Sequence, residues 1–194
     1  LVVASTVEYS GTNQTVANQV YGNLKLSSST GSAVKTFPTS ALTIVGNLQS
    51  IQGAGSSVTF NAGASLEING NVLIGSSTTF NAGAFSHNMY GNWVNDGSFN
   101  GNTGTITFLG SGSLVSGIGM QNFNNLTVAA SQVAFSANDI SLSGNLSTIS
   151  SGSFSQASGG TLLMTGASKT INGSGISLDN FSVSGSVTTT PTFG

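Results

Sequence analysis

The stretch S-S-V-T-F-N-A-G-A, from Ser56 to Ala64, returns almost unchanged as S-S-T-T-F-N-A-G-A, from Ser76 to Ala84. Within each copy polar and apolar residues alternate, which is the period of a β-strand and not of a helix. A strand unit that repeats at a period of about 20 residues is too small to bury its apolar face alone, so neighbouring copies must stack on one another. The duplication therefore predicts a β-solenoid.

Longer repeats extend this pattern in both directions. Three segments, residues 5–26, 104–128 and 160–183, share a strand that ends in glycine and a second strand that begins beside an asparagine. Their first strands read T-V-E-Y-S-G, T-I-T-F-L-G and T-L-L-M-T-G, and their second strands read Y-G-N-L-K-L, F-N-N-L-T-V and L-D-N-F-S-V. We expect the three segments to be equivalent units of one repeat architecture.

Gly-Asn pairs recur between the predicted strands, and the first four pairs lie at positions 22–23, 46–47, 70–71 and 91–92. This spacing gives a coil of roughly 20 to 25 residues. Glycine takes positive φ freely and asparagine tolerates it, so the pairs suit sharp corners. If the coils stack in register, the corner asparagines form a ladder in which each side-chain amide bonds its equivalents above and below. The predicted ladder consists of Asn23, Asn47, Asn71, Asn92 and Asn145.

These patterns predict an all-β fold, a right-handed parallel β-helix of about nine coils that forms a single domain over residues 1–194. At about 4.8 Å per coil the stack is roughly 43 Å long. A β-sandwich also accommodates many short strands but gives no reason for neighbouring segments to repeat. Aromatic side chains recur at equivalent places and are expected to stack in the core. They are Phe37, Phe60, Phe80, Phe108, Phe123 and Phe135.

The arrangement of T-x-T-F-x-G segments before N-L-T-V strands resembles the β-helical repeats of large secreted bacterial surface proteins, the adhesin and filamentous-haemagglutinin-like group. The segments from Thr105 to Gly110 and from Phe123 to Val128 match these motifs, and the resemblance covers nearly the whole chain. It implies an extracellular or cell-surface location and a non-enzymatic role as a structural rod. Such a rod is either the shaft of an adhesin or a self-stacking filament subunit.

The composition argues against nucleic-acid binding, membrane insertion, disulfides and thiolate metal sites. Only 8 of the 194 residues are charged, arginine is absent, and the lysines Lys25, Lys35 and Lys169 are scattered. Nothing therefore supplies the basic stripe that a nucleic-acid backbone requires. No apolar run reaches the length of a membrane-spanning helix, so membrane insertion is not expected. Cysteine is absent as well, which excludes disulfides and thiolate metal sites.

The residues that carry chemistry are few and dispersed. The acids are widely separated, although stacking of coils can bring acids together, and His87 has no histidine or cysteine partner and is expected in a turn or in solvent. We therefore predict no enzymatic activity, no cofactor and no metal site. The acids are Glu8, Glu67, Asp96, Asp139 and Asp179.

Two binding roles remain as alternatives to a passive rod. Tyr90 and Trp93 flank a Gly-Asn corner, and exposed aromatic rings of this kind stack on sugars, so both are candidates for glycan contact. Ice binding needs a regular Thr-x-Thr face and is less favoured, because Thr105 and Thr107 stand in an isolated pair. No polar terminal coil is apparent, so we also expect end-to-end self-association through uncapped ends.

Overall fold

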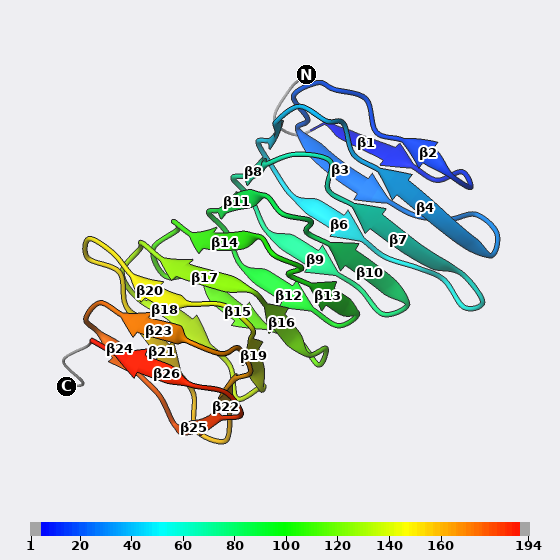
Figure 1. The fold of residues 1–194 in the computed structure, drawn as a ribbon. Helices are drawn as coiled ribbons and strands as arrows, with labels where there is room; N and C mark the ends of the chain where they lie inside the picture. The colour runs from blue at the N-terminus through cyan, green and yellow to red at the C-terminus, as the bar shows by residue number, and fades with distance from the viewer. Residues whose placement is uncertain (1–4, 191–194) are drawn as a thin grey trace.

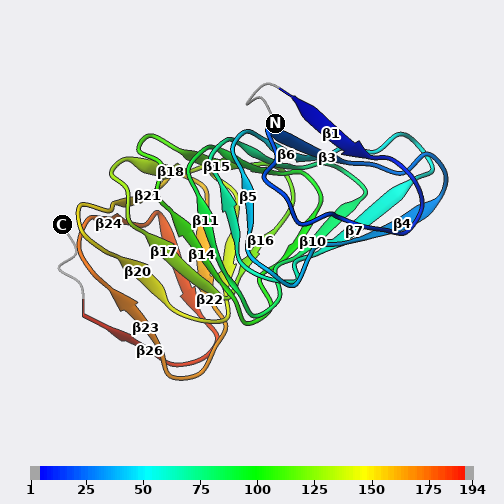
Figure 2. The same ribbon diagram turned by 90° about the horizontal axis from the view of Figure 1, so that it is seen from above.

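The computed structural model describes residues 5–190, so the two ends of the predicted domain lie outside the described residues. Within this range the chain contains 26 strands and no helix. The strands form three parallel sheets that run the length of a β-solenoid (Figure 1). The first coils, in blue, and the last coils, in red, lie at opposite ends of the stack in Figure 1 and again in Figure 2.

Each coil contributes one strand to each sheet, except that the first described coil has no strand in sheet C. Sheet A consists of β1 (Thr6–Tyr9), β3 (Asn23–Leu26), β6 (Leu48–Ser50), β9 (Val72–Ile74), β12 (Trp93–Asn95), β15 (Leu114–Ser116), β18 (Val133–Phe135), β21 (Phe154–Gln156) and β24 (Ile176–Ser177). Sheet B consists of β2 (Gln14–Thr15), β4 (Ser32–Thr36), β7 (Ser57–Asn61), β10 (Thr78–Asn81), β13 (Ser98–Asn100), β16 (Gln121–Phe123), β19 (Ile140–Leu142), β22 (Thr161–Met164) and β25 (Asn180–Val183). Sheet C consists of β5 (Leu42–Ile44), β8 (Leu66–Ile68), β11 (Ser86–Met89), β14 (Thr105–Phe108), β17 (Asn125–Val128), β20 (Leu146–Thr148), β23 (Lys169–Asn172) and β26 (Val187–Thr189).

The registers confirm the predicted fold class and coil length. Leu24 lies opposite Leu48, and Leu48 lies opposite Val72, so each turn in this part of sheet A has the length that the Gly-Asn spacing predicts. In sheet B, Phe60 lies opposite Phe80 across one turn. All strand pairings among residues 5–190 are parallel, as a solenoid requires and an antiparallel sandwich does not allow.

Alternation along each strand separates the core from the surface. In β7 the side chains of Val58 and Phe60 are buried while Ser57, Thr59 and Asn61 are only partly buried. The predicted core phenylalanines are all buried, and the prediction is confirmed for each of them: Phe37, Phe60, Phe80, Phe108, Phe123 and Phe135. The rings of Phe60 and Phe80 are stacked with their centroids 4.6 Å apart. The core is therefore continuous from coil to coil.

The three long sequence repeats lie on three different sheets. The pair β1 and β3 belongs to sheet A, β14 and β17 to sheet C, and β22 and β25 to sheet B. In every case the threonine that opens the first strand lies opposite the asparagine of the second. The repeats thus share one two-strand unit, but successive copies are turned around the solenoid axis and face different directions.

Candidate functional site

The Gly-Asn corners stack in two groups. Asn23, Asn47, Asn71 and Asn92 lie at the entrance to sheet A in successive coils, whereas Asn145 lies at the entrance to sheet C. In the first group the side-chain Oδ1 of each asparagine accepts a hydrogen bond from the backbone N–H of the next, at 2.8 Å for each of the three pairs. Asn145 belongs to a separate row, in which its N–H donates to Oδ1 of Asn125 over 2.9 Å.

These bonds differ from the predicted amide ladder. We expected side chains to bond one another, but each side chain instead bonds the backbone of the following coil. The last member of the first row, Asn92, accepts from the N–H of Leu114 over 2.9 Å, so a residue of another type can occupy the next step. The asparagine side chain is needed at each step as the acceptor, whereas any residue with a backbone N–H can be the donor. The row therefore ends at Leu114, whose side chain has no acceptor.

The glycines of these corners have a different role from the predicted one. The positive-φ glycines among the described residues do not include Gly22, Gly46, Gly70, Gly91 or Gly144. The glycines are instead required by close packing. A Cβ atom on Gly70 would lie 2.5 Å from the backbone of Gly46, and one on Gly91 would lie 2.4 Å from the carbonyl oxygen of Gly70. The column of glycines allows the corners to approach within hydrogen-bonding distance.

The first described coil supplies polar partners to a buried side chain of the second. Lys35 is buried, and its Nζ donates to the carbonyl oxygen of Gly11 (2.5 Å), the carbonyl oxygen of Thr12 (2.8 Å) and Oε1 of Gln14 (2.7 Å). Burial lowers the pKa of the Lys35 ammonium. The three acceptors replace the hydrogen bonds that water would otherwise make with this group.

A second polar contact lies in the same coil. The hydroxyl groups of Tyr9 and Tyr21 are 2.9 Å apart, and the Tyr21 hydroxyl donates to the carbonyl oxygen of Ala17 over 2.8 Å. Burial, together with the bond from Tyr9, raises the pKa of the Tyr21 phenol. The N-terminal end of the described core is therefore formed by amide, phenol and ammonium groups as well as aliphatic ones.

The last coil differs in character. Phe181 lies opposite Leu162, and Val183 lies opposite Met164, so both occupy core-facing positions of β25. Leu162 and Met164 are fully buried, but Phe181 is 43% exposed and Val183 is 41% exposed. The two ends of the described stack are therefore chemically different, one hydrogen-bonded and one apolar.

The two aromatic candidates for glycan contact are separated by the fold. Tyr90 is 40% exposed, but Trp93 is 0% exposed and its Nε1 donates to Oε1 of Gln121 over 3.0 Å. The ring of Trp93 lies against Phe99 with centroids 4.8 Å apart. The prediction that Trp93 contacts a glycan is wrong, because the Gly-Asn corner turns it inward along β12.

Four of the five acids and the histidine occupy structural positions, whereas Glu67 is exposed in β8. Three aspartates accept backbone N–H groups of a neighbouring coil: Asp96 from Ile118, Asp139 from Thr161 and Asp179 from Gly159. On the outer face of sheet A, Oε1 of Glu8 accepts from Oγ of Ser27 and lies 3.1 Å from Nζ of Lys25. The hydrogen bond from Ser27, followed by that from Lys25, lowers the pKa of this carboxyl.

His87 is fully buried in β11, so the expectation of a turn or solvated histidine is wrong. Its Nδ1 accepts from the N–H of Leu66 over 3.1 Å, and its Nε2 lies 2.8 Å from the carbonyl oxygen of Ala82. The carbonyl requires a donor, so this histidine is the Nε2–H tautomer. Burial lowers the pKa of His87, since the neutral ring satisfies both partners.

A true amide ladder exists on the outer face of sheet B, at asparagines that the corner pattern does not include. Nδ2 of Asn81 donates to Oδ1 of Asn61 over 2.8 Å, and Nδ2 of Asn100 donates to Oδ1 of Asn81 over 2.7 Å. The signal was present in the duplicated T-F-N segments, which return as S-F-N from Ser98 to Asn100. These asparagines follow inward phenylalanines, so alternation places them outside.

The ladder is the centre of a longer row that we call the Thr/Asn column. Its members lie opposite one another in successive coils and point away from the core: Thr36, Asn61, Asn81, Asn100, Asn122 and Ser141. A parallel row, two residues earlier in each strand, begins with Val34 and continues through Thr59, Thr79 and Ser98. This face therefore carries hydroxyl and amide groups at a regular spacing.

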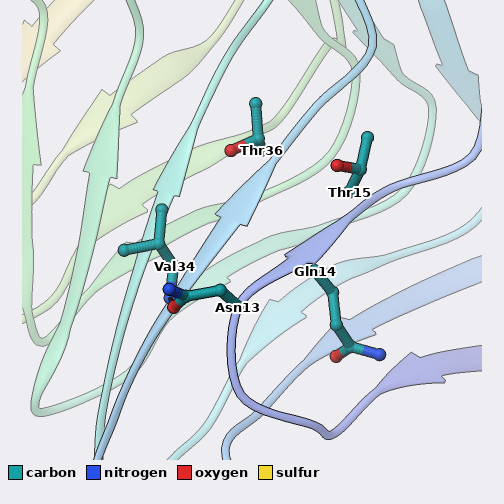
Figure 3. Close-up of a pocket in the computed structure, with 5 residues that line it drawn as sticks. All are labelled: Asn13, Gln14, Thr15, Val34 and Thr36. Carbon is teal, nitrogen blue, oxygen red and sulfur yellow. Dashed lines mark hydrogen bonds between the residues drawn. The ribbon is translucent and has the colours of Figure 1, made fainter.

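Three hollows lie on this face, and the smallest, of about 210 Å³, lies beside Ser141 and is lined by Met120 and Leu163 among others. The other two adjoin the ends of the column. The N-terminal hollow, of about 340 Å³, is lined by Asn13, Gln14, Thr15, Val34 and Thr36. Figure 3 shows Thr15 and Thr36 on neighbouring strands, with Asn13 beside Val34. The central hollow, of about 370 Å³, adjoins the other end of the column and is lined by Asn100, Asn102, Asn122, Ser141 and Ser143, among others. These two hollows are open and polar.

Within residues 5–190, no group of three or more histidine, cysteine, aspartate or glutamate side chains is placed to hold a metal ion. The same range contains no helix that is long and apolar enough to cross a membrane. Comparison of the chain with family models, with curated proteins and with solved structures gives no match.

Proposed function

We propose that this chain is a non-enzymatic structural rod of a secreted bacterial surface protein. The observation that carries the proposal is continuous bonding between coils: sheets A and B pair in an unbroken order from the first coil to the last. Rows of asparagine and glycine add further bonds at the corners. Each coil is thereby tied to the next along every side, which gives a stiff element whose role is reach.

The scarcity of ion pairs supports the same role. The described residues contain one ion pair, between Lys25 and Glu8, and it is exposed. Cohesion therefore comes from backbone hydrogen bonds and apolar burial, which salt screens little, and not from surface charges. Such a rod would keep its form outside the cell, where ionic strength varies.

The rod would serve as an adhesin shaft or as a filament subunit that stacks end to end. The exposed core positions Phe181 and Val183 support self-association, because an apolar end is stabilised when another surface covers it. The hydrogen-bonded first coil offers a less apolar surface for such stacking. We therefore expect contacts between copies to involve the C-terminal coil.

Electron microscopy across a range of protein concentration tests the rod and its assembly together. Rods of roughly 43 Å are expected from about nine coils, and ordered filaments or paired rods at higher concentration would show self-association. Single rods at all concentrations would instead favour the shaft. Compact particles without a long axis would overturn the structural proposal.

A pair of variants localises the contact. Phe181→Asp places a charge in the exposed end, whereas Ile149→Asp places one at a half-exposed position in the loop between β20 and β21. If the end mediates assembly, only Phe181→Asp reduces it. An equal effect of the two variants would contradict stacking through the C-terminal coil.

A further inference from the structure

The outer face of sheet B combines three features that the structural role does not require. The amides of Asn61, Asn81 and Asn100 are fixed by one another, hollows lie at both ends of the Thr/Asn column, and the column itself carries no charged residue. The corner asparagines already connect the coils. The regular polar surface is therefore available for recognition.

The amide ladder leaves hydrogen-bonding groups free and oriented. A side-chain amide has two N–H donors and two acceptor positions on its oxygen. Asn81 uses one donor toward Asn61 and one acceptor position toward Asn100. The remaining donor and acceptor are held in a fixed direction, so binding would order little that is not already ordered.

The residue types of the column indicate which class of ligand this face can bind. A nucleic acid or an acidic polymer needs cationic groups, and the only lysine of the strands around the ladder, Lys35, is buried and faces inward. A protein partner favours a face with aromatic, methionine or arginine anchors, and the column contains none of these. Hydroxyl and amide groups match the hydroxyls of a neutral sugar.

The length of the column favours a polysaccharide chain over a single sugar as the ligand. Six members of the column span five coil spacings, roughly 24 Å, and the central hollow continues past Ser141 to Ser143. We propose that the Thr/Asn column and the central hollow form a binding surface for a linear neutral polysaccharide that runs along the solenoid axis. This role goes beyond that of the rod, and either can fail without the other.

Calorimetric titration with neutral linear hexasaccharides of glucose, mannose and xylose tests the surface. Asn100 lies in both the ladder and the central hollow, so Asn100→Thr should weaken binding about tenfold, as expected for loss of a well-placed hydrogen bond. The control is Asn88→Thr, the same exchange on the outer face of sheet C, which should leave binding unchanged. A hexagalacturonate probe should bind more weakly than the neutral chains.

Side-chain amide resonances of the unaltered protein give a second readout that does not depend on a variant. Addition of the hexasaccharide that binds should shift the signals of Asn81, Asn100 and Asn122 and leave that of Asn88 in place. The proposal is overturned if no neutral hexasaccharide binds, if Asn100→Thr binds normally, or if the shifts lie elsewhere. Inhibition of ice recrystallisation without glycan binding would also overturn it and would assign the face to ordered water.

Discussion

The side-chain Oδ1 of Asn47 accepts a hydrogen bond of 2.8 Å from the backbone N–H of Asn71, which lies one coil further along the solenoid. The bond lies between two backbone bonds of 2.9 Å, from the N–H of Gly70 to the carbonyl oxygen of Gly46 and from the N–H of Leu48 to the carbonyl oxygen of Asn71. Its donor belongs to a backbone group that would otherwise rely on water. The corner rows therefore extend the bonding of the sheets around the bends.

Asn47→Ala should lower the free energy of unfolding by about 1 kcal/mol, the usual net value of one such bond. Hydrogen exchange at the Asn71 amide should also become faster, because its acceptor is removed. Asn88→Ala is the control, since no side-chain hydrogen bond of Asn88 occurs among the described residues. Equal losses in the two variants would show that the corner bond contributes nothing specific.

Gly70→Ala should lower the stability of the protein more than a substitution of the neighbouring Asn71. A Cβ atom at Gly70 would lie 2.5 Å from the backbone of Gly46, so the two corners must separate. Strain of this kind typically costs about 1 to 3 kcal/mol, and chemical denaturation measures it. Gly53→Ala is the matched control: it has no heavy atom within 4 Å of the new Cβ and no positive φ, so its stability should be unchanged or slightly raised.

The sequence predicts the strands, the coil length and the aromatic core because these depend on short-range alternation and spacing. It does not predict which of the three sheets each long repeat joins. Thr6 and Thr105 open equivalent segments, yet their strands lie on sheets A and C. The number of residues between repeats does not fix the number of strands between them, since corners vary in length. A shared unit can therefore recur at another angle.

Local sequence also does not decide whether each candidate side chain points into the core or outward. Trp93 follows a Gly-Asn corner and has the polar neighbour Asn92, so exposure and burial are equally consistent with its local sequence. Its inward direction is decided by the register of β12 against β9, where Trp93 lies opposite the buried Val72. The amide ladder at Asn61 and Asn81 was predictable in principle, because the duplicated T-F-N segments place an asparagine one residue after an inward ring.

Phe80→Ala should destabilise the protein by about 3 to 5 kcal/mol, because a fully buried ring that stacks on Phe60 is replaced by a cavity. Phe181→Ala is the comparison within the same inward row of sheet B, and it should cost much less because that ring is 43% exposed. Urea unfolding of both variants gives the difference. A similar loss at the two positions would mean that the end of the stack is covered in solution.

The buried His87 should make the stability of the protein depend on pH below about 6.5, the ordinary pKa of histidine. Burial lowers its pKa from the ordinary value of 6.5, so the unfolded chain takes up a proton at a pH where the folded chain does not. Stability is therefore fully present above pH 6.5 and falls as the pH decreases toward the folded pKa, with a slope of up to about 1.4 kcal/mol per pH unit. The lowered pKa of Glu8 acts only as the pH falls below its ordinary value of 4.5, so a slope above pH 4.5 does not come from this carboxyl. Denaturation at a series of pH values should show the slope in the unaltered protein and a flat profile in His87→Gln; a slope that persists in the variant would assign the effect to another group.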